Sequence, residues 1–312
     1  MKSYVLSLCL IFATSDLCAQ AAEWQPSPGH TQLPLWPDQA PDAQLVPGPE
    51  SVHTTKDDDQ VGGKPYRYVS NVSQPTLTVY APQGKNSGAV VVVIPGGGFE
   101  ILAMDLEGTE VCDWLTSNGV TCVLLKYRVP GAPYDWHCKC RPDNFVIPTM
   151  ALEDVQRAVR LVRSRAVKLH IDPHKVGVLG FSAGGYLVAE ISTQYERRLY
   201  QPVDAADQES CRPDFAVAIY PGHMDKQGNL NQNVPVTAQA PPTFLLQAED
   251  DGVDSVDDSL LYYAALKQAG VPVEMHLYAQ GGHAFGLRPT KLPITHWPEL
   301  VTQWLRTIDM IP

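Results

Sequence analysis

The chain has 312 residues, of which 44% are hydrophobic and 18% charged, with 27 prolines and 23 glycines. That hydrophobic fraction can fill a core, which excludes a wholly disordered chain, and so many prolines and glycines exclude a long coiled coil. The formal net charge of −11 predicts an acidic surface that repels phosphates, so we expect neither nucleic acid nor an anionic membrane as a partner.

The first residues show the three regions of a secretory signal peptide in order. Lys2 is basic, residues 4–13 are almost wholly apolar, and residues 19–21 place small side chains before a cleavage site at Ala22. The apolar run is too short to span a bilayer. We therefore predict a signal peptide at residues 1–21, a secreted or periplasmic protein, and no stable membrane insertion.

Residues 22–62 are rich in Pro, Gly, Asp and Gln, which predicts an extended N-terminal arm before a domain at residues 63–312. Within this domain, patterns typical of strands and helices alternate. Strands are predicted at residues 77–80, 89–94, 120–127, 176–181, 215–220, 243–248 and 273–278, and helices at residues 109–117, 151–165, 184–193, 259–269 and 297–308. This alternation predicts an α/β fold with a mostly parallel central sheet and helices on both faces.

The strand at 176–181 leads into a G-x-S-x-G motif at residues 180–184, directly before a helix. A serine on such a sharp strand-to-helix turn is typical of a nucleophile, and glycines on both sides allow the backbones to approach closely. We predict that Ser182 is the nucleophile. The alternative is a glycine-rich turn with an unreactive serine.

Residues 95–99, P-G-G-G-F, follow the buried strand at 89–94. Consecutive glycines can turn backbone N–H groups into a cavity. We predict that Gly97 and Gly98, with the N–H of Ala183, form an oxyanion hole, and that Phe99 contacts substrate. A flexible loop and a phosphate site are the alternatives, although no G-x-x-x-x-G-K-[ST] motif is present.

The general base is predicted at His283, which has glycines before it and follows the last strand. The acid that orients its imidazole should follow the strand at 243–248, where Asp250 and Asp251 are close alternatives and Asp254 is a weaker one. The order Ser, Asp, His along the chain is that of serine hydrolases with parallel sheets. This chemistry requires no cofactor.

Five cysteines lie beyond the predicted signal peptide, so at least one is unpaired within the chain. The patterns around Cys112 and Cys122 are those of small core residues. Cys138 or Cys140 could bridge to Cys211, because all three lie in loop-like sequence. No second ligand pair at zinc spacing accompanies Cys138 and Cys140, so we expect no metal.

The helix predicted at residues 151–165 is amphipathic. Asp154 and Arg157 are three residues apart on it, and this spacing predicts an ion pair with a structural role.

From residue 76 to residue 308 the chain resembles α/β-hydrolases of the esterase and lipase type. In particular, it resembles secreted esterases related to feruloyl and acetylxylan esterases and to hormone-sensitive-lipase-like carboxylesterases. The stretches that carry the resemblance are residues 94–99, 125–130, 151–158, 180–185 and 281–283. The family often carries an aspartate eight residues before a serine that opens the next helix, and counting back from Ser259 favours Asp251.

The chain departs from this family in two places. Pro95 stands where a histidine is more usual, and the insertion at residues 130–148 is longer. We expect the insertion to overhang the site as a lid, with Trp136 and His137 contacting substrate. The alternative is a surface loop held by a disulfide.

The resemblance implies a secreted carboxylic ester hydrolase with a Ser-His-Asp acyl-enzyme mechanism. Its expected substrates are short-chain acyl esters such as acetylated plant polysaccharide. A secreted serine peptidase of the prolyl-oligopeptidase type is one alternative, although no propeller-length domain precedes the core. A non-catalytic, hydrolase-like binding module is another. The sequence predicts no particular oligomeric state.

Overall fold

The computed structural model describes residues 23–44, 46–56, 60–129 and 147–312. The predicted signal peptide lies outside these ranges, as do Trp136, His137 and most of the predicted lid. Cys138 and Cys140 lie outside them too.

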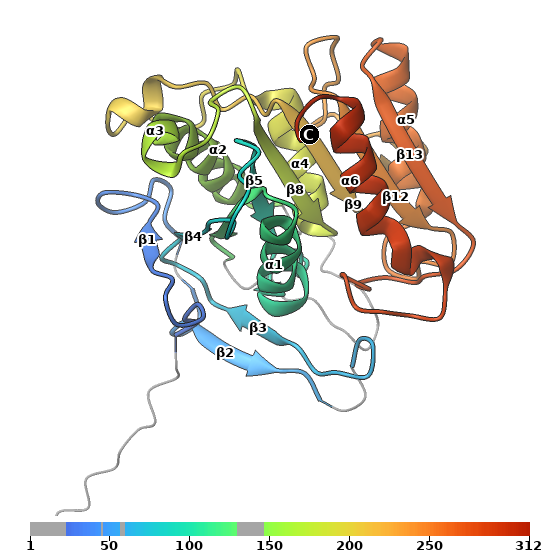
Figure 1. Ribbon diagram of the computed structural model, residues 1–312, viewed down its shortest axis with the longest axis horizontal. Coiled ribbons are helices and arrows are strands. Elements are labelled where there is room, and N and C mark those ends of the chain that lie inside the picture. Colours follow the sequence, from blue (N-terminus) through green and yellow to red (C-terminus); the bar gives the residue numbers. More distant parts are fainter. Residues whose placement is uncertain (1–22, 45, 57–59, 130–146) are drawn as a thin grey trace, which may run out of the picture.

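An eight-stranded sheet forms the centre of the molecule, in the order β1-β4-β7-β5-β8-β9-β12-β13 (Figure 1). Its strands are β1 (Gln32–Pro34), β4 (Thr76–Tyr80), β5 (Val90–Ile94), β7 (Thr121–Lys126), β8 (Val176–Phe181), β9 (Phe215–Ile219), β12 (Thr243–Ala248) and β13 (Val273–Tyr278). Only β1 and β4 pair antiparallel with their neighbours. Strands β5, β7, β8, β9 and β12 are buried along their whole length, which is why their sequences are mostly apolar. Polar side chains interrupt only β7, at Thr121 and Lys126, and β12, at Thr243 and Gln247. The predicted mostly parallel sheet is confirmed.

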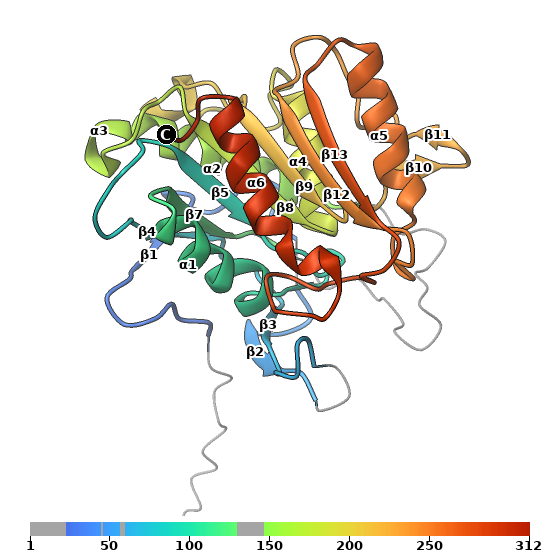
Figure 2. The same cartoon turned by 45° about the vertical axis from the view of Figure 1, so that its right-hand side comes forward.

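Helices cover both faces of this sheet (Figures 1 and 2). Helices α1 (Glu110–Ser117) and α6 (Trp297–Thr307) lie on one face, and α2 (Thr149–Ser164), α4 (Ala183–Gln194) and α5 (Val256–Gln268) lie on the other. The shorter helical segments are η2 (Asp105–Thr109), α3 (Ala166–Leu169), η3 (Ala205–Gln208) and η4 (Pro293–His296). The two-sided cover follows from right-handed crossovers, because the strand order runs one way from β5 to β7 and the other way from β8 to β13.

Part of the segment predicted as an N-terminal arm packs on the domain. Strand β1 forms an edge of the central sheet, and Trp24, Leu35 and Trp36 are buried in the core. A small sheet joins β2 (Ser51–Thr54), β3 (Arg67–Ser70) and β6 (Ile101–Leu102), and a hairpin joins β10 (Asp225–Lys226) and β11 (Asn229–Leu230). Because β6 directly follows the glycine-rich loop, the small sheet helps to hold that loop in place.

The predicted ion pair between Asp154 and Arg157 is wrong. Asp154 accepts hydrogen bonds from Arg128 and from the indole of Trp36, whereas Arg157 pairs with Asp204 and Asp207. The side chains of Asp154 and Arg157 are 0% and 2% exposed. Buried charges need partners that satisfy them fully, and other segments of the chain supply these partners here.

A disulfide joins Cys112 on α1 to Cys122 on β7. Both residues are buried, as predicted for core positions, but the analysis of the sequence did not pair them. Their Cα atoms are 5.1 Å apart because α1 packs directly against β7. Cys211 is buried and has no disulfide partner among the described residues, and the predicted bridge to it from Cys138 or Cys140 is not tested because both of those cysteines lie outside them.

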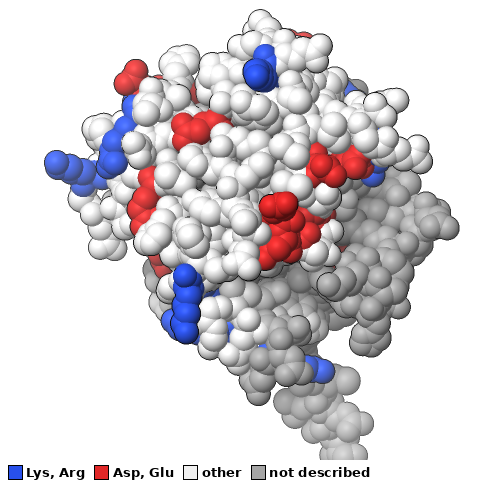
Figure 3. Space-filling view, turned by 90° about the vertical axis from the view of Figure 1, so that its right-hand side faces the viewer, with Lys and Arg blue, Asp and Glu red and all other residues white. Residues whose placement is uncertain are grey.

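The surface seen in Figure 3 carries small, separate groups of acidic side chains and a few isolated Lys and Arg residues. This distribution agrees with the net charge of −11. Within the described ranges, no helix has the length and apolar character needed to cross a membrane.

Candidate active site

Ser182 lies on a strained turn between β8 and α4. Its φ and ψ angles are 50° and −119°, a backbone conformation that residues other than glycine rarely adopt. A Cβ atom on Gly180 would overlap the carbonyl oxygen of Gly184, and one on Gly184 would overlap that of Ile94. Both glycines of the motif are therefore required by close backbone contacts at this turn.

The structure brings together the three side chains predicted to act with one another. His283 Nε2 lies 3.0 Å from Ser182 Oγ, and His283 Nδ1 lies 2.7 Å from Asp251 Oδ2. The imidazole is 13% exposed and the carboxylate of Asp251 is fully buried. The residues follow β8, β12 and β13, whose carboxyl ends meet at one edge of the sheet.

A network of hydrogen bonds holds Asp251 in position. Its Oδ1 accepts bonds from the backbone N–H groups of Val253 and Asp254, and its Oδ2 accepts one from Gln247 Nε2 at 3.1 Å. Gln247 is oriented in turn by the hydroxyl of Ser259, which donates to Gln247 Oε1 at 2.8 Å.

Asp250 has a different role from Asp251. Its Oδ1 accepts hydrogen bonds from the backbone N–H groups of Gly281 and Gly282, at 2.8 and 2.7 Å. It therefore holds the loop that carries His283, while Asp251 contacts the imidazole.

Asp254 is a second carboxylate at the nucleophile. Ser182 Oγ is 3.2 Å from Asp254 Oδ2, and the same oxygen lies 3.8 Å from His283 Nε2. The sequence suggested Asp254 only as a weak alternative to Asp251. Its contact with Ser182 depends on the path of the loop after β12, which sequence spacing does not report.

The glycine-rich loop lies beside Ser182. Gly97 and Gly98 have φ angles of 132° and 65°, and a Cβ on Gly97 would overlap the backbone of Ile101. Both glycines line the same cavity as Ser182, and Ala183 begins α4 directly behind it. Their role as an oxyanion hole stays a prediction.

Phe99 was predicted to contact substrate, but its side chain is fully buried. The ring packs near the rings of Tyr186 and His223, and Phe99 is not among the residues that line the cavity. Its φ of 64° turns the chain after the glycines, so that the side chain supports the loop from within the core.

Glu107 and Tyr220 form a buried support that the sequence did not predict. Glu107 accepts hydrogen bonds from the Gly96 N–H at 2.7 Å and from the Tyr220 hydroxyl at 2.8 Å. The Tyr220 ring centroid lies 4.8 Å from that of His283. Burial raises the pKa of Glu107, against the lowering effect of the Tyr220 hydrogen bond and the His283 charge. The pair thus links the glycine-rich loop to the imidazole.

Opposing effects set the pKa of His283. Burial lowers it, but the hydrogen bond with Asp251 and the nearby charges of Asp254, Asp251 and Glu107 raise it. The net result is a pKa above the usual 6.5.

A cavity of about 470 Å³ opens over these groups. Most of its wall is apolar, with a few polar side chains near Ser182. It is lined by Tyr66, Gly97, Gly98, Ile101, Ala103, Leu106, Glu107, Ser182, His223, Val253, Asp254, His283 and Ala284. In the part of the chain that the structure describes, no cluster of three or more His, Cys, Asp and Glu residues could hold a metal ion.

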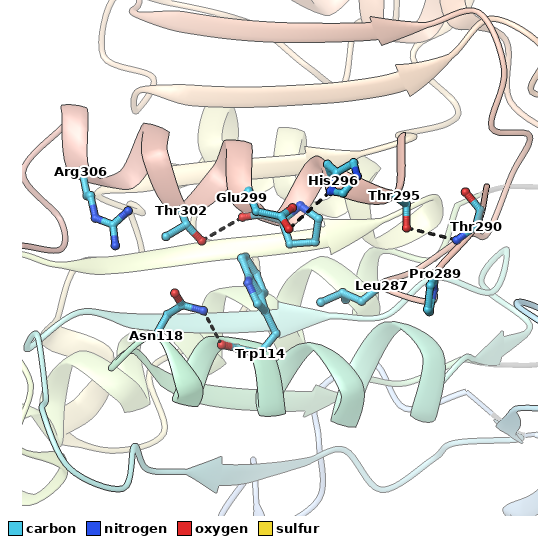
Figure 4. A pocket seen from close by; sticks show the side chains of 11 residues that line it. Trp114, Asn118, Leu287, Pro289, Thr290, Thr295, His296, Glu299, Thr302 and Arg306 are labelled. Carbon is cyan, nitrogen blue, oxygen red and sulfur yellow. Dashed lines mark hydrogen bonds and ion pairs between the residues drawn. The ribbon is translucent and has the colours of Figure 1, made fainter. Parts of the chain in front are cut away.

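A larger groove of about 860 Å³ lies between α1 and α6 (Figure 4). Trp114 and Asn118 line it from α1, and Glu299, Thr302 and Arg306 line it from α6. None of Ser182, Asp251 and His283 borders it, so this groove is separate from the candidate active site.

This fold and site define an α/β-hydrolase: a serine lies on a strand-to-helix turn of a mostly parallel sheet and is hydrogen-bonded to a histidine that follows the last strand. The family model that matches the chain is BD-FAE, over residues 77–222. A solved acetyl ester-xyloside bifunctional hydrolase from Caldicellulosiruptor lactoaceticus is 30% identical, with a TM-score of 0.69, and the match covers 90% of this chain and 97% of that one. The chain belongs to the BD-FAE family of α/β-hydrolases, as the resemblance in its sequence indicated.

Two curated relatives are considerably longer than the matched region. An acetylxylan esterase of Xylanibacter ruminicola is 29% identical over 231 residues, which are 70% of this chain and 45% of that protein. Endo-1,4-beta-xylanase B of Butyrivibrio fibrisolvens is 26% identical over 67% of this chain and 34% of that protein. The chain thus matches less than half the length of each.

Proposed function

We propose that this protein is a secreted carboxylic ester hydrolase that acts on short-chain acyl esters such as acetylated plant polysaccharide. The observation that carries the proposal is the hydrogen-bonded line from Ser182 through His283 to Asp251, beside a cavity. The acetylxylan esterase and the acetyl ester-xyloside hydrolase among the relatives support the substrate class. Secretion rests on the signal-peptide pattern of residues 1–21.

The mechanism is a two-step acyl transfer. Ser182 Oγ attacks the ester carbonyl while His283 Nε2 takes its proton, and Asp251 stabilises the imidazolium that forms. His283 then gives this proton to the departing alcohol. Water, activated by His283 in the same way, releases the acid and restores Ser182.

The N–H groups of Gly97, Gly98 and Ala183 stabilise the charge that develops on the carbonyl oxygen. Each donor that acts in this way contributes about 3–4 kcal/mol to the lowering of the barrier. The first turn of α4 adds the positive end of its dipole behind Ser182. The Glu107 hydrogen bond to Gly96 holds the loop before any substrate arrives.

A panel of esters tests this function. We expect hydrolysis of p-nitrophenyl acetate at a higher kcat/KM than of the octanoate, release of acetate from acetylated xylan, and covalent labelling by a fluorophosphonate. Cleavage of Pro-linked peptides without ester hydrolysis would favour the peptidase alternative. Absence of both hydrolysis and labelling would favour a binding module.

The dependence of activity on pH follows from the pKa of His283. The general base acts as neutral imidazole, so kcat/KM rises with pH and reaches half its maximum at a pH above 6.5, where the raised pKa lies. Asp254→Asn removes one of the charges that raise this pKa, so its acid limb should move to lower pH. Initial rates on p-nitrophenyl acetate from pH 5 to 9 measure the acid limb of the wild type and that of Asp254→Asn. A limb at or below pH 6.5 in the wild type, or one that Asp254→Asn leaves in place, contradicts this expectation.

A further inference from the structure

The carboxylate of Asp254 is held against the nucleophile by the backbone around it. The Asp254 N–H donates to Asp251 Oδ1 at 3.1 Å, and the Asp254 carbonyl accepts from Gln247 Nε2 at 3.0 Å. On the other side, a Cβ on Gly222 would overlap the Asp254 carboxylate. The side chain is 13% exposed and lines the cavity. The chain therefore accommodates a second acid at this point.

The single hydroxyl proton of Ser182 can be donated either to Asp254 or to His283, and the acyl-transfer reaction withdraws it from Asp254. In the free enzyme, the hydroxyl of Ser182 lies within hydrogen-bond distance of both Asp254 Oδ2, at 3.2 Å, and His283 Nε2, at 3.0 Å. During attack the proton passes to His283, and the acylated serine has no proton to donate. In a site of low exposure, a donor that replaces the lost one stabilises the carboxylate.

The leaving alcohol is the part of the substrate best placed to supply that donor. His283 Nε2 protonates the leaving oxygen, which must therefore come within about 3 Å of this nitrogen. Asp254 Oδ2 lies 3.8 Å from the same nitrogen. A hydroxyl on the carbon next to the esterified carbon reaches the carboxylate from this position, and an anionic group there is repelled.

We propose that Asp254 is a specificity-determining residue that selects esters of vicinal diols, by accepting a hydrogen bond from the free hydroxyl beside the ester. Partly acetylated pyranosides belong to this substrate class. The inference rests on the proposed ester hydrolase function and deepens it, because it specifies the alcohol and the residue that recognises it.

Three small acetates test the role of Asp254. They are the trans-2-hydroxycyclohexyl, trans-2-methoxycyclohexyl and unsubstituted cyclohexyl esters, of which only the first carries a hydroxyl donor. We expect the wild type to prefer the hydroxy ester to the methoxy ester in kcat/KM. In Asp254→Ala this preference should fall by about 10- to 100-fold, the usual contribution of a hydrogen bond to a charged group.

The ratio of the two kcat/KM values is the decisive readout. It is independent of the fraction of folded enzyme and of any shift in the pKa of His283, because both affect the two esters alike. Asp254→Asn, which keeps the shape of the side chain, should also lower the ratio. Asp257→Asn, on an exposed carboxylate of α5, is the matched control and should leave the ratio unchanged.

Two further outcomes are distinguishable. If the wild type hydrolyses all three esters without preference, or if Asp254→Ala retains the wild-type ratio, the inference is overturned and the proposed function stands. If the wild type hydrolyses none of the three esters and no p-nitrophenyl acetate, the proposed function itself fails, and the inference falls with it.

Discussion

Replacing Ser182 by alanine is expected to lower kcat for p-nitrophenyl acetate by about 10⁴- to 10⁶-fold. The substitution removes the only atom that forms the acyl-enzyme in the proposed mechanism. The remaining rate comes from binding and from the oxyanion donors acting on attack by water. The rate of p-nitrophenolate release by identically purified wild-type and variant proteins measures the change. Labelling by a fluorophosphonate should be lost in parallel.

Ser164→Ala is the matched control for this substitution. Ser164 is exposed near the end of α2, and its hydroxyl bonds only locally to the Leu161 carbonyl, so we expect wild-type kcat. Circular dichroism and a thermal unfolding curve establish that both variants are folded. A folded Ser182→Ala protein that keeps full activity would assign the nucleophile elsewhere.

The second substitution with a large expected effect distinguishes the adjacent acids Asp250 and Asp251. Asp251→Asn should lower kcat by about 10⁴-fold, because an amide in this position no longer stabilises the imidazolium and can hold the imidazole in the wrong tautomer. Asp250→Asn should have a much smaller effect. Its remaining carbonyl oxygen can still accept from the Gly281 and Gly282 N–H groups, and it does not contact the imidazole.

The comparison is internally controlled, because the same substitution is made at neighbouring positions of one loop. Steady-state kinetics on p-nitrophenyl acetate, with unfolding curves for both variants, provide the measurement. A larger loss in Asp250→Asn than in Asp251→Asn would reverse the assignment of the acid.

Local patterns in the sequence predicted much of this fold. Buried parallel strands need apolar side chains on both faces, so β5, β8 and β9 appear as continuous runs without polar side chains. The G-x-S-x-G motif at residues 180–184 was equally recognisable in the sequence, because the overlap that any side chain would create at Gly180 and Gly184 restricts both positions to glycine. The predicted helices differ from those observed by only a few residues at their ends.

Contacts between distant segments were harder to predict from the sequence. Spacing along α2 suggested an ion pair between Asp154 and Arg157, but both side chains are buried and pair with other segments. The pattern around Cys112 and Cys122 indicated burial and not the bond between them. Phe99 follows the glycine-rich loop, yet its backbone conformation turns the ring into the core.

By itself, the sequence determined the class of fold, the serine on its turn and the histidine after the last strand, because each depends on local sterics and on strand order. The resemblance to the esterase family favoured Asp251 as the acid, but the residues alone left three candidates, and the tertiary structure shows that Asp251 contacts that histidine. Asp250, Asp251 and Asp254 share one short loop and similar chemistry, and their roles differ only in the direction in which the backbone points each carboxylate. That direction is set by hydrogen bonds to other segments, including Gln247 and Gly281, which the residue types of the loop do not specify.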